Sequence, residues 1–184
     1  MSKLKYSSKS LSFIIPVYNE EKRLQKLIKE ILKFKKKHNN LRFEFIIVND
    51  GSKDNTNTIL KRYFYKQNYI KIVNLKKNFG KGYALKKGVS IAKNELIITI
   101  DADLSVKFDQ ILFWQNKYKI DSNKSVYFGS RKHKLSRIKT TFNREFLGIF
   151  LSIIIYILID KKLRDTQCGF KLYPKKLGKI IFRK

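Results

Sequence analysis

The feature that most constrains this chain is a regular alternation of short apolar runs with segments of helical periodicity. Four runs rich in Val, Ile and Phe span residues 11–18, 43–48, 69–75 and 96–100. The stretches between them carry apolar residues every three to four positions. Because parallel strands need a crossover, usually a helix, to return the chain, this alternation predicts an α/β fold with a mostly parallel sheet and helices on both faces.

Helices are predicted between the four strands and after the last one. The first follows Asn19, a candidate N-cap, and the next two are expected at about 54–66 and from Gly80 onward. Residues 108–118 are predicted to be helical, and 126–128 to form another short strand. The apolar positions of the first helix are Leu24, Leu27, Ile28, Ile31 and Leu32.

Length and composition fit one folded domain. The chain has 184 residues, 43% of them hydrophobic, which is enough to bury a core. Residues 1–10 are expected to form a basic tail, and 11–184 a single domain. The only cysteine, Cys168, excludes an intrachain disulfide. No signal peptide or run of about 18 apolar residues is visible, so no transmembrane helix is expected in this chain.

The formal net charge of +28 predicts attraction to polyanions. Nucleic acid, an anionic membrane surface and phosphorylated substrates are all compatible with it. An AT-rich genome, which favours Lys, Asn, Ile, Phe and Tyr, is an alternative cause, so the charge alone selects no partner. No nucleic-acid recognition motif is present, which argues against that partner.

Acidic and polar side chains follow three of the predicted strands. Asp101 and Asp103 come after the fourth apolar run, Asp50 after the second, and Asn19-Glu20 after the first. In an extended chain, residues two apart face the same side, so both carboxylates of the acidic pair are expected on one face. Such a pair suits Mg²⁺ or Mn²⁺, although an isolated Asp-x-Asp also fits a solvated turn. Because ligands bind beyond the carboxyl ends of parallel strands, these side chains are expected to converge on one cleft.

Residues 146–159 form an uncharged apolar run with basic residues near both ends. The run is too short to span a bilayer as a helix. A helix lying in the membrane interface, at about 140–160, is the preferred interpretation, and a buried core helix is the alternative. In the first strand, Pro16 predicts that the strand's C-terminal end is irregular or lacks a hydrogen-bonded neighbour at that position.

A series of motifs resembles the family 2 glycosyltransferases of the GT-A fold, over about residues 11–174. The later motifs are similar to those of dolichyl-phosphate β-glucosyltransferases, and polyprenyl-phosphate relatives and dolichyl-phosphate mannose synthases share much of the pattern. The motifs are Ile15-Pro16-Val17-Tyr18-Asn19-Glu20-Glu21, Asn49-Asp50-Gly51-Ser52-Lys53-Asp54, Asn78-Phe79-Gly80-Lys81-Gly82, Asp101-Ala102-Asp103, Phe128-Gly129-Ser130-Arg131-Lys132-His133 and Arg164-Asp165-Thr166-Gln167-Cys168-Gly169-Phe170-Lys171-Leu172-Tyr173.

The resemblance implies inverting transfer of a hexose to polyprenyl or dolichyl phosphate at a membrane surface. UDP-glucose is the favoured donor and GDP-mannose the alternative, with Mg²⁺ or Mn²⁺ as cofactor and a peripheral location on the cytoplasmic face of the membrane. One alternative is a family 2 enzyme that glycosylates a saccharide or another hydroxyl acceptor. The other is a non-catalytic remnant that binds a nucleotide or nucleic acid.

The resemblance also implies roles for individual residues. Asp101 and Asp103 would hold the metal, and Asp165 is the candidate base, with Arg131 as a second catalytic residue. Because a phosphate acceptor is already largely ionised near pH 7, the site needs positioning more than proton abstraction. The implied nucleotide-sugar pocket consists of Pro16, Tyr18, Glu20, Asp50, Lys81 and Asp101. The implied acceptor-phosphate contacts are Arg131, Gln167 and Lys171.

The chain departs from the family pattern at two motif positions and at its C-terminal end. Asn49 replaces the first Asp of the usual Asp-Asp-Gly-Ser, and Ser105 stands where related enzymes can carry a metal-contacting Gln. Relatives also continue beyond the position of Lys184 through a further helix and strand, so the C-terminal end of the domain is expected to be shortened.

Overall fold

The computed structural model describes residues 9–118, 120, 125–130 and 168–183. Three candidate site residues, Arg131, Asp165 and Gln167, lie outside these ranges, as does the predicted interfacial helix at about 140–160. None of the helices within the described ranges is long and apolar enough to cross a membrane.

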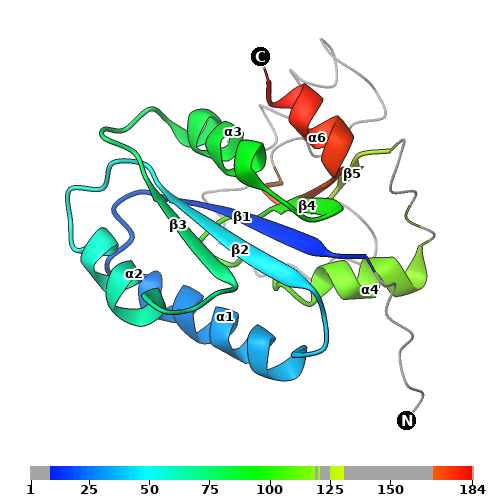
Figure 1. Cartoon of the computed structure of the whole chain (residues 1–184), viewed down its shortest axis with the longest axis horizontal. Coiled ribbons are helices and arrows are strands. Elements are labelled where there is room, and N and C mark those ends of the chain that lie inside the picture. Colours follow the sequence, from blue (N-terminus) through cyan, green and yellow to red (C-terminus); the bar gives the residue numbers. More distant parts are fainter. Residues whose placement is uncertain (1–8, 119, 121–124, 131–167, 184) are drawn as a thin grey trace, which may run out of the picture.

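A six-stranded sheet in the order β3-β2-β1-β4-β6-β5 forms the centre of the fold (Figure 1). β1 pairs in parallel with β2 and β4, and β2 with β3, whereas β6 runs antiparallel to both β4 and β5. The predicted, mostly parallel sheet is therefore confirmed. The strands are β1 Leu11–Val17, β2 Phe43–Asn49, β3 Ile70–Asn74, β4 Leu96–Thr99, β5 Tyr127–Phe128 and β6 Lys171–Pro174.

Helices cover both faces of the sheet, as the alternation predicted. Core residues of α1, α2 and α4 pack on one face, and those of α3 and α6 on the other (Figure 1). The helices are α1 Leu24–Lys37, α2 Thr56–Phe64, α3 Lys81–Ile91, α4 Gln110–Lys117 and α6 Lys175–Ile181.

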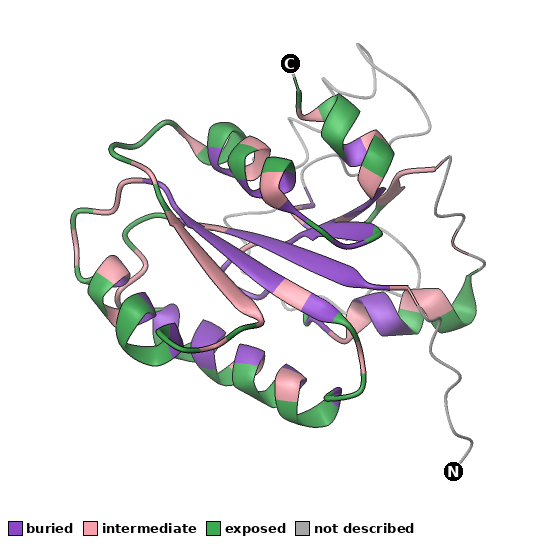
Figure 2. Ribbon diagram, viewed as in Figure 1, coloured by how far each residue is buried: buried purple, intermediate pink, exposed green. Residues whose placement is uncertain are grey.

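The central strands are buried on both sides, which explains why their sequences are almost continuously apolar (Figure 2). On one face, Phe13 stacks on Phe45 with ring centroids 4.9 Å apart, and Phe34 meets Phe13 edge-to-face at 5.3 Å. On the other face, α3 lies close to the sheet at Gly88. A Cβ there would lie 2.4 Å from Cγ2 of Ile14, so only glycine permits this approach.

Two details of the first strand and helix were predicted wrongly, and a third was confirmed on one side of the strand only. Asn19 is not an N-cap, because α1 begins at Leu24 and Asn19 has a left-handed backbone with φ of 51°. Leu32 is exposed, because the apolar face of α1 does not reach it. Pro16 lies beyond the last residue pair between β1 and β4, but on the other side of the strand it is paired with Val48 of β2.

Candidate functional site

The carboxyl ends of the parallel strands are tied together by backbone hydrogen bonds. The amide of Asp50 donates to the carbonyl of Val17 over 2.9 Å, and the amide of Leu75 donates to the carbonyl of Asn49 over 2.9 Å. The loops that follow β1, β2 and β3 therefore start side by side. This edge is where open parallel sheets bind ligands.

Asp50 holds the loop that leads into α3. Its two carboxylate oxygens accept hydrogen bonds from the amides of Phe79 and Gly80, each over 2.9 Å. Next to it, Gly51 has φ of 66°, and a Cβ there would lie 2.3 Å from the carbonyl carbon of Lys77. The buried carboxylate and the glycine together fix the start of α3 against the end of β2.

Lys81 and Asp101, to which the sequence assigned separate roles, form an ion pair in the structure. The ammonium nitrogen of Lys81 lies 2.5 Å from Oδ1 of Asp101, and both side chains are partly exposed. Lys81 is the first residue of α3, and Asp101 follows β4 by two positions. The carboxylate of Asp101, at the end of β4, is therefore already paired with a positively charged group.

Gly169 packs directly against the carboxylate of Asp101. A Cβ at Gly169 would lie 2.2 Å from Oδ2 of Asp101, so any other residue would displace one of them. The hydroxyl of Thr99 donates to the carbonyl of Gly169 over 2.9 Å, and the amide of Gly129 donates to the carbonyl of Phe170 over 2.8 Å. The described chain on both sides of residues 131–167 thus lies close to Asp101.

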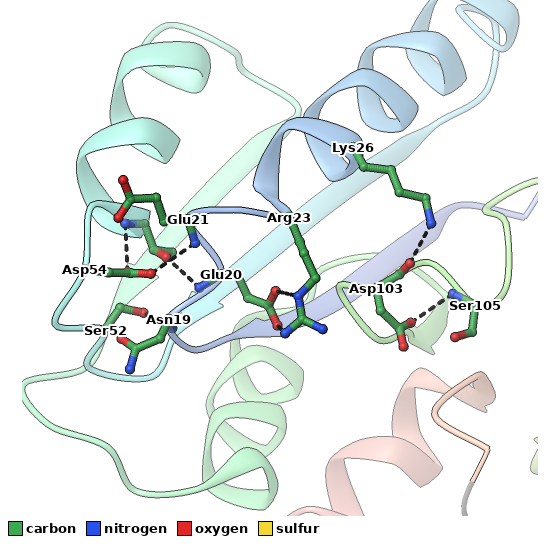
Figure 3. Close-up of polar contacts among 10 residues, drawn as sticks. Asn19, Glu20, Glu21, Arg23, Lys26, Ser52, Asp54, Asp103 and Ser105 are labelled. Carbon is green, nitrogen blue, oxygen red and sulfur yellow. Dashed lines mark hydrogen bonds and ion pairs between the residues drawn. The ribbon is translucent and has the colours of Figure 1, made fainter. Parts of the chain in front are cut away.

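Asp103 lies in a turn, so the extended geometry predicted for the acidic pair is wrong. The amide of Leu104 donates to the carbonyl of Asp101 over 3.1 Å, and Leu104 is buried with φ of 55°. Oδ1 of Asp103 accepts from the amide of Ser105 over 2.9 Å, as in an Asx turn (Figure 3). Lys26 of α1 donates to the backbone carbonyl of Asp103 over 2.9 Å.

The loops after β1 and β2 are joined by side-chain to backbone hydrogen bonds (Figure 3). The amide of Glu21 donates to Asp54 over 3.1 Å, and the amide of Thr56 donates to the same carboxylate over 3.0 Å. Burial raises the pKa of Asp54, but the hydrogen bonds from Thr56 and Glu21 outweigh it and lower this pKa below its usual value. Further bonds run from the amide of Asn19 to Ser52 and from the amide of Glu20 to Thr56.

The remaining described candidates lie around this edge. Glu20 forms an ion pair with Arg23, with nitrogen–oxygen distances of 2.7 and 2.9 Å, so its charge is already balanced (Figure 3). Tyr18 is exposed and Pro16 is half-buried. The ammonium of Lys171, at the start of β6, lies over the ring of Phe128, 5.4 Å from its centroid.

The residues after β4 offer carboxylate oxygens, the ligand type that divalent cations such as Mg²⁺ prefer. Among the described residues, no three His, Cys, Asp or Glu side chains group as a ready-made metal site. Asp101 and Asp103 supply carboxylate oxygens, and Mg²⁺ is commonly held by one or two carboxylates together with substrate phosphates. One of these oxygens, Oδ1 of Asp101, is already paired with the ammonium of Lys81 at 2.5 Å.

Comparison with known proteins identifies the family. The sequence profile described as "Glycosyl transferase family 2" matches residues 12–180. The chain belongs to glycosyl transferase family 2. This match confirms the resemblance that the motifs predicted, and it spans all four parallel strands and β6.

Curated relatives align with nearly all of the chain. Dolichyl-phosphate beta-glucosyltransferase ALG5D of Trichomonas vaginalis is 36% identical over 181 residues, covering 94% of this chain and 55% of the relative. The human dolichyl-phosphate beta-glucosyltransferase is 33% identical over 193 residues, covering 95% of this chain and 58% of the relative. The chain thus spans a little over half the length of these relatives.

Solved structures share the architecture. Glucosyl-3-phosphoglycerate synthase of Mycobacterium tuberculosis aligns with a TM-score of 0.62 at 15% identity, covering 91% of this chain and 58% of that one. TarS of Staphylococcus aureus in complex with UDP-GlcNAc gives 0.59 at 20% identity, covering 90% and 45%. At these identities the likeness concerns the fold alone, and it confirms the predicted GT-A fold.

Some residues at this edge were not found by sequence reasoning. Thr99 and Gly169 lie in or next to recognised motifs, but nothing local shows that they contact each other across 70 positions. Lys26 is one of many lysines on α1 and has no distinguishing pattern. Gly51 stands next to Asp50 in a turn motif, which could have indicated its positive φ.

Proposed function

We propose that this chain transfers a hexose, with inversion, from a nucleotide diphosphate sugar to dolichyl or polyprenyl phosphate at the cytoplasmic face of a membrane. UDP-glucose is the proposed donor. The observation that carries this proposal is the alignment of 94% of the chain with a relative named a dolichyl-phosphate beta-glucosyltransferase. The geometry at the carboxyl edge of the sheet supports it, because basic and acidic groups suited to a nucleotide diphosphate meet there.

In this proposal, Asp101 and Asp103 hold Mg²⁺ or Mn²⁺, which when bound would offset the charge that develops on the leaving diphosphate. Lys81 would exchange its contact with Asp101 for one with the donor phosphates, since ammonium groups suit phosphate oxygens. Asp101 would thus pair with Lys81 in the absence of a donor and be available as a metal ligand in its presence. Asp50 would keep the start of α3 in place for this exchange.

The donor pocket is proposed to include Pro16, Tyr18 and Glu20 after β1, together with Asp50. The exposed ring of Tyr18 offers an apolar face, and the polar groups beside it are held by the bonds between the first two loops. Glu20 would act as part of a neutral pair with Arg23, which limits its repulsion of a diphosphate.

The acceptor side is proposed to comprise Arg131, Gln167 and Lys171, with Asp165 as candidate base. Lys171 begins β6 opposite Thr99, next to the strand-end acid. Ser130 and Cys168, which flank residues 131–167 in sequence, belong to the described chain near Gly169. Because a phosphate acceptor needs no deprotonation near pH 7, the proposed role of these groups is mainly to position it.

The test is a transfer assay with UDP-glucose, UDP-GlcNAc or GDP-mannose as donor, with Mg²⁺ or Mn²⁺, and with a short, water-soluble polyprenyl phosphate or a saccharide as acceptor. Asp103→Asn is expected to reduce kcat/KM on the order of 100-fold, because it removes one charge that would hold the cation. Glu30→Gln is the matched control, since it removes one acidic charge from the surface of α1, where Glu30 lies 4.0 Å from Lys33.

Transfer from UDP-glucose, with none from UDP-GlcNAc or GDP-mannose, would support the proposed donor. Transfer to a saccharide but not to the lipid phosphate would contradict the proposed acceptor. Full activity of Asp103→Asn would show that Asp103 is not a metal ligand.

A further inference from the structure

Two exposed aromatic rings lie side by side at the start of α3. Phe79 and Tyr83 are 46% and 43% exposed, and their ring centroids are 4.7 Å apart. Single exposed rings are common on protein surfaces, but a contacting pair forms a small continuous apolar area. This pair lies at the carboxyl edge of the sheet, where β3 ends and α3 begins (Figure 1).

The surroundings of these rings are basic. Between Asp54 and Glu95 the chain contains ten Lys or Arg residues and no Asp or Glu. The ammonium of Lys77 lies over the ring of Phe79, 5.3 Å from its centroid. Lys76 and Lys77 are exposed, as is Lys87, which follows Tyr83 by one helical turn.

Two acidic side chains at this edge of the sheet have other partners. Asp50 is buried and accepts two backbone hydrogen bonds, and Asp101 forms an ion pair with Lys81. Within the described residues, neither carboxylate forms an ion pair with Lys76, Lys77 or Lys87, so these exposed lysines contribute positive charge to this edge of the sheet.

The rings are also held in place. Asp50 binds the amides of Phe79 and Gly80, and the tight contact at Gly51 fixes the backbone at Lys77. A surface presented on fixed backbone loses little conformational entropy when it binds a partner. Two exposed aromatic rings with lysines around them have the composition of surfaces that bind the bilayer interface. In that region aromatic rings lie at headgroup level and lysines contact anionic lipids.

We propose that this basic aromatic surface, formed by Lys76, Lys77, Phe79, Tyr83 and Lys87, docks the chain on an anionic phospholipid bilayer. The inference rests on the proposed function in that a lipid-linked acceptor needs the strand ends to face the membrane. With this surface against the headgroups, the start of α3 and the neighbouring Asp101 lie near the level of a lipid phosphate. It is a contact in addition to the predicted interfacial helix at about 140–160.

The experiment measures partitioning of the full chain onto vesicles of phosphatidylcholine with about one quarter phosphatidylserine. The variant Phe79→Ser with Tyr83→Ser is expected to bind on the order of tenfold more weakly, because two rings no longer enter the interface. The matched control is Tyr63→Ser with Tyr65→Ser, which removes two exposed rings from the far end of α2 in the same basic stretch. That control is expected to bind as the unaltered chain does.

Unchanged partitioning of the Phe79 and Tyr83 variant, or an equal loss in the control, would overturn the proposal. So would weaker UDP binding together with unchanged vesicle binding, which would assign the rings to the nucleotide pocket. Circular dichroism establishes that each variant is folded. Vesicle binding needs neither donor nor acceptor, so its outcome is separate from the transfer assay. If transfer also occurs, the variant should lose more activity toward the vesicle-embedded acceptor than toward the water-soluble one.

Discussion

At the residue scale, the strand-end carboxylate of Asp101 is constrained from two sides. It contacts Lys81 on one side and the backbone of Gly169 on the other. The steric contact with Gly169 restricts the position of the carboxylate. The ion pair with Lys81 balances its charge. Under the proposed function, a bound donor would replace the contact with Lys81 and leave the packing against Gly169 unchanged.

Replacing Gly169 by Ala should disturb the carboxylate of Asp101. A Cβ at 2.2 Å from Oδ2 forces the side chain or the backbone to move, which costs roughly 1–3 kcal/mol of stability. We expect about tenfold weaker binding of UDP with Mn²⁺, measured by calorimetry, and a lower melting temperature.

Gly82→Ala is the control for this substitution. A Cβ at Gly82 meets nothing within 4 Å, and Ala is favoured over Gly within a helix by at most about 1 kcal/mol at this second position of α3. Its binding of UDP with Mn²⁺ should be unchanged and its stability equal or higher. If Gly169→Ala behaved in the same way, the packing of Gly169 would have no bearing on the site.

At the element scale, α1 supports the segment between Asp103 and α4 at two places. Near its start, Lys26 donates to the carbonyl of Asp103. At its end, Lys37 and the buried ring of His38 both contact Asp109, with Nε2 of His38 at 2.8 Å from Oδ1. Both ends of the segment from Asp103 to Asp109 are thus bonded to α1. The predicted metal site is therefore expected to depend on the packing of α1.

Asp109→Asn tests this support through its pH dependence. Burial raises the pKa of Asp109, but the hydrogen bonds and charges of Lys37 and His38 outweigh burial and lower this pKa below its usual 3.8. A carboxyl with a lowered folded-state pKa stabilises the fold above its unfolded pKa, and this contribution is lost as the pH falls through the folded value. The variant should be less stable than the unaltered chain at pH 7, by roughly 1 kcal/mol for a partly exposed pair.

Urea unfolding at pH 7, 5 and 3 provides the measurement. The difference between the two proteins should remain between pH 7 and pH 5 and shrink below about 3.8. Glu30→Gln on the same helix should change stability little, because its pair with Lys33 is a surface contact with charges 4.0 Å apart. A difference that stayed constant down to pH 3 would show that Asp109 acts through packing and not through its charge.

At the scale of the whole molecule, the net charge of +28 on 184 residues opposes compaction through self-repulsion. Much of the positive charge lies on surfaces where few acidic partners are available, as in the stretch between Asp54 and Glu95. The same excess that would attract a nucleotide diphosphate or an anionic bilayer therefore lowers stability in the absence of these partners.

Salt should accordingly stabilise the protein while weakening its vesicle binding. Raising NaCl from about 50 to 500 mM shortens the Debye length from roughly 14 to 4 Å, so repulsion between surface lysines is screened. We expect the melting temperature in a thermal scan to rise by about a few degrees, and partitioning onto anionic vesicles to fall. A melting temperature that decreased over this range would indicate that attractive pairs outweigh the net repulsion.

The sequence by itself determined the class of fold and the family. Apolar periodicity is a local property, so the runs that became β1 to β4 and most of the buried face of α1, apart from Leu32 and Phe34, could be identified without tertiary information. The order of the motifs was likewise readable, and the family match over residues 12–180 confirms it. Ends of elements were less exact, as the start of α1 at Leu24 illustrates.

Only the tertiary structure decided how the candidate site is assembled. The contact of Gly169 with Asp101, the hydrogen bonds of Asp50 to the start of α3, and the place of β6 between β4 and β5 join segments that are distant in sequence. Even the geometry of the acidic pair followed from its surroundings, because burial of Leu104 turns the chain that the sequence predicted to be extended. Such contacts depend on how helices and strands pack in three dimensions, and no local pattern of residues encodes them.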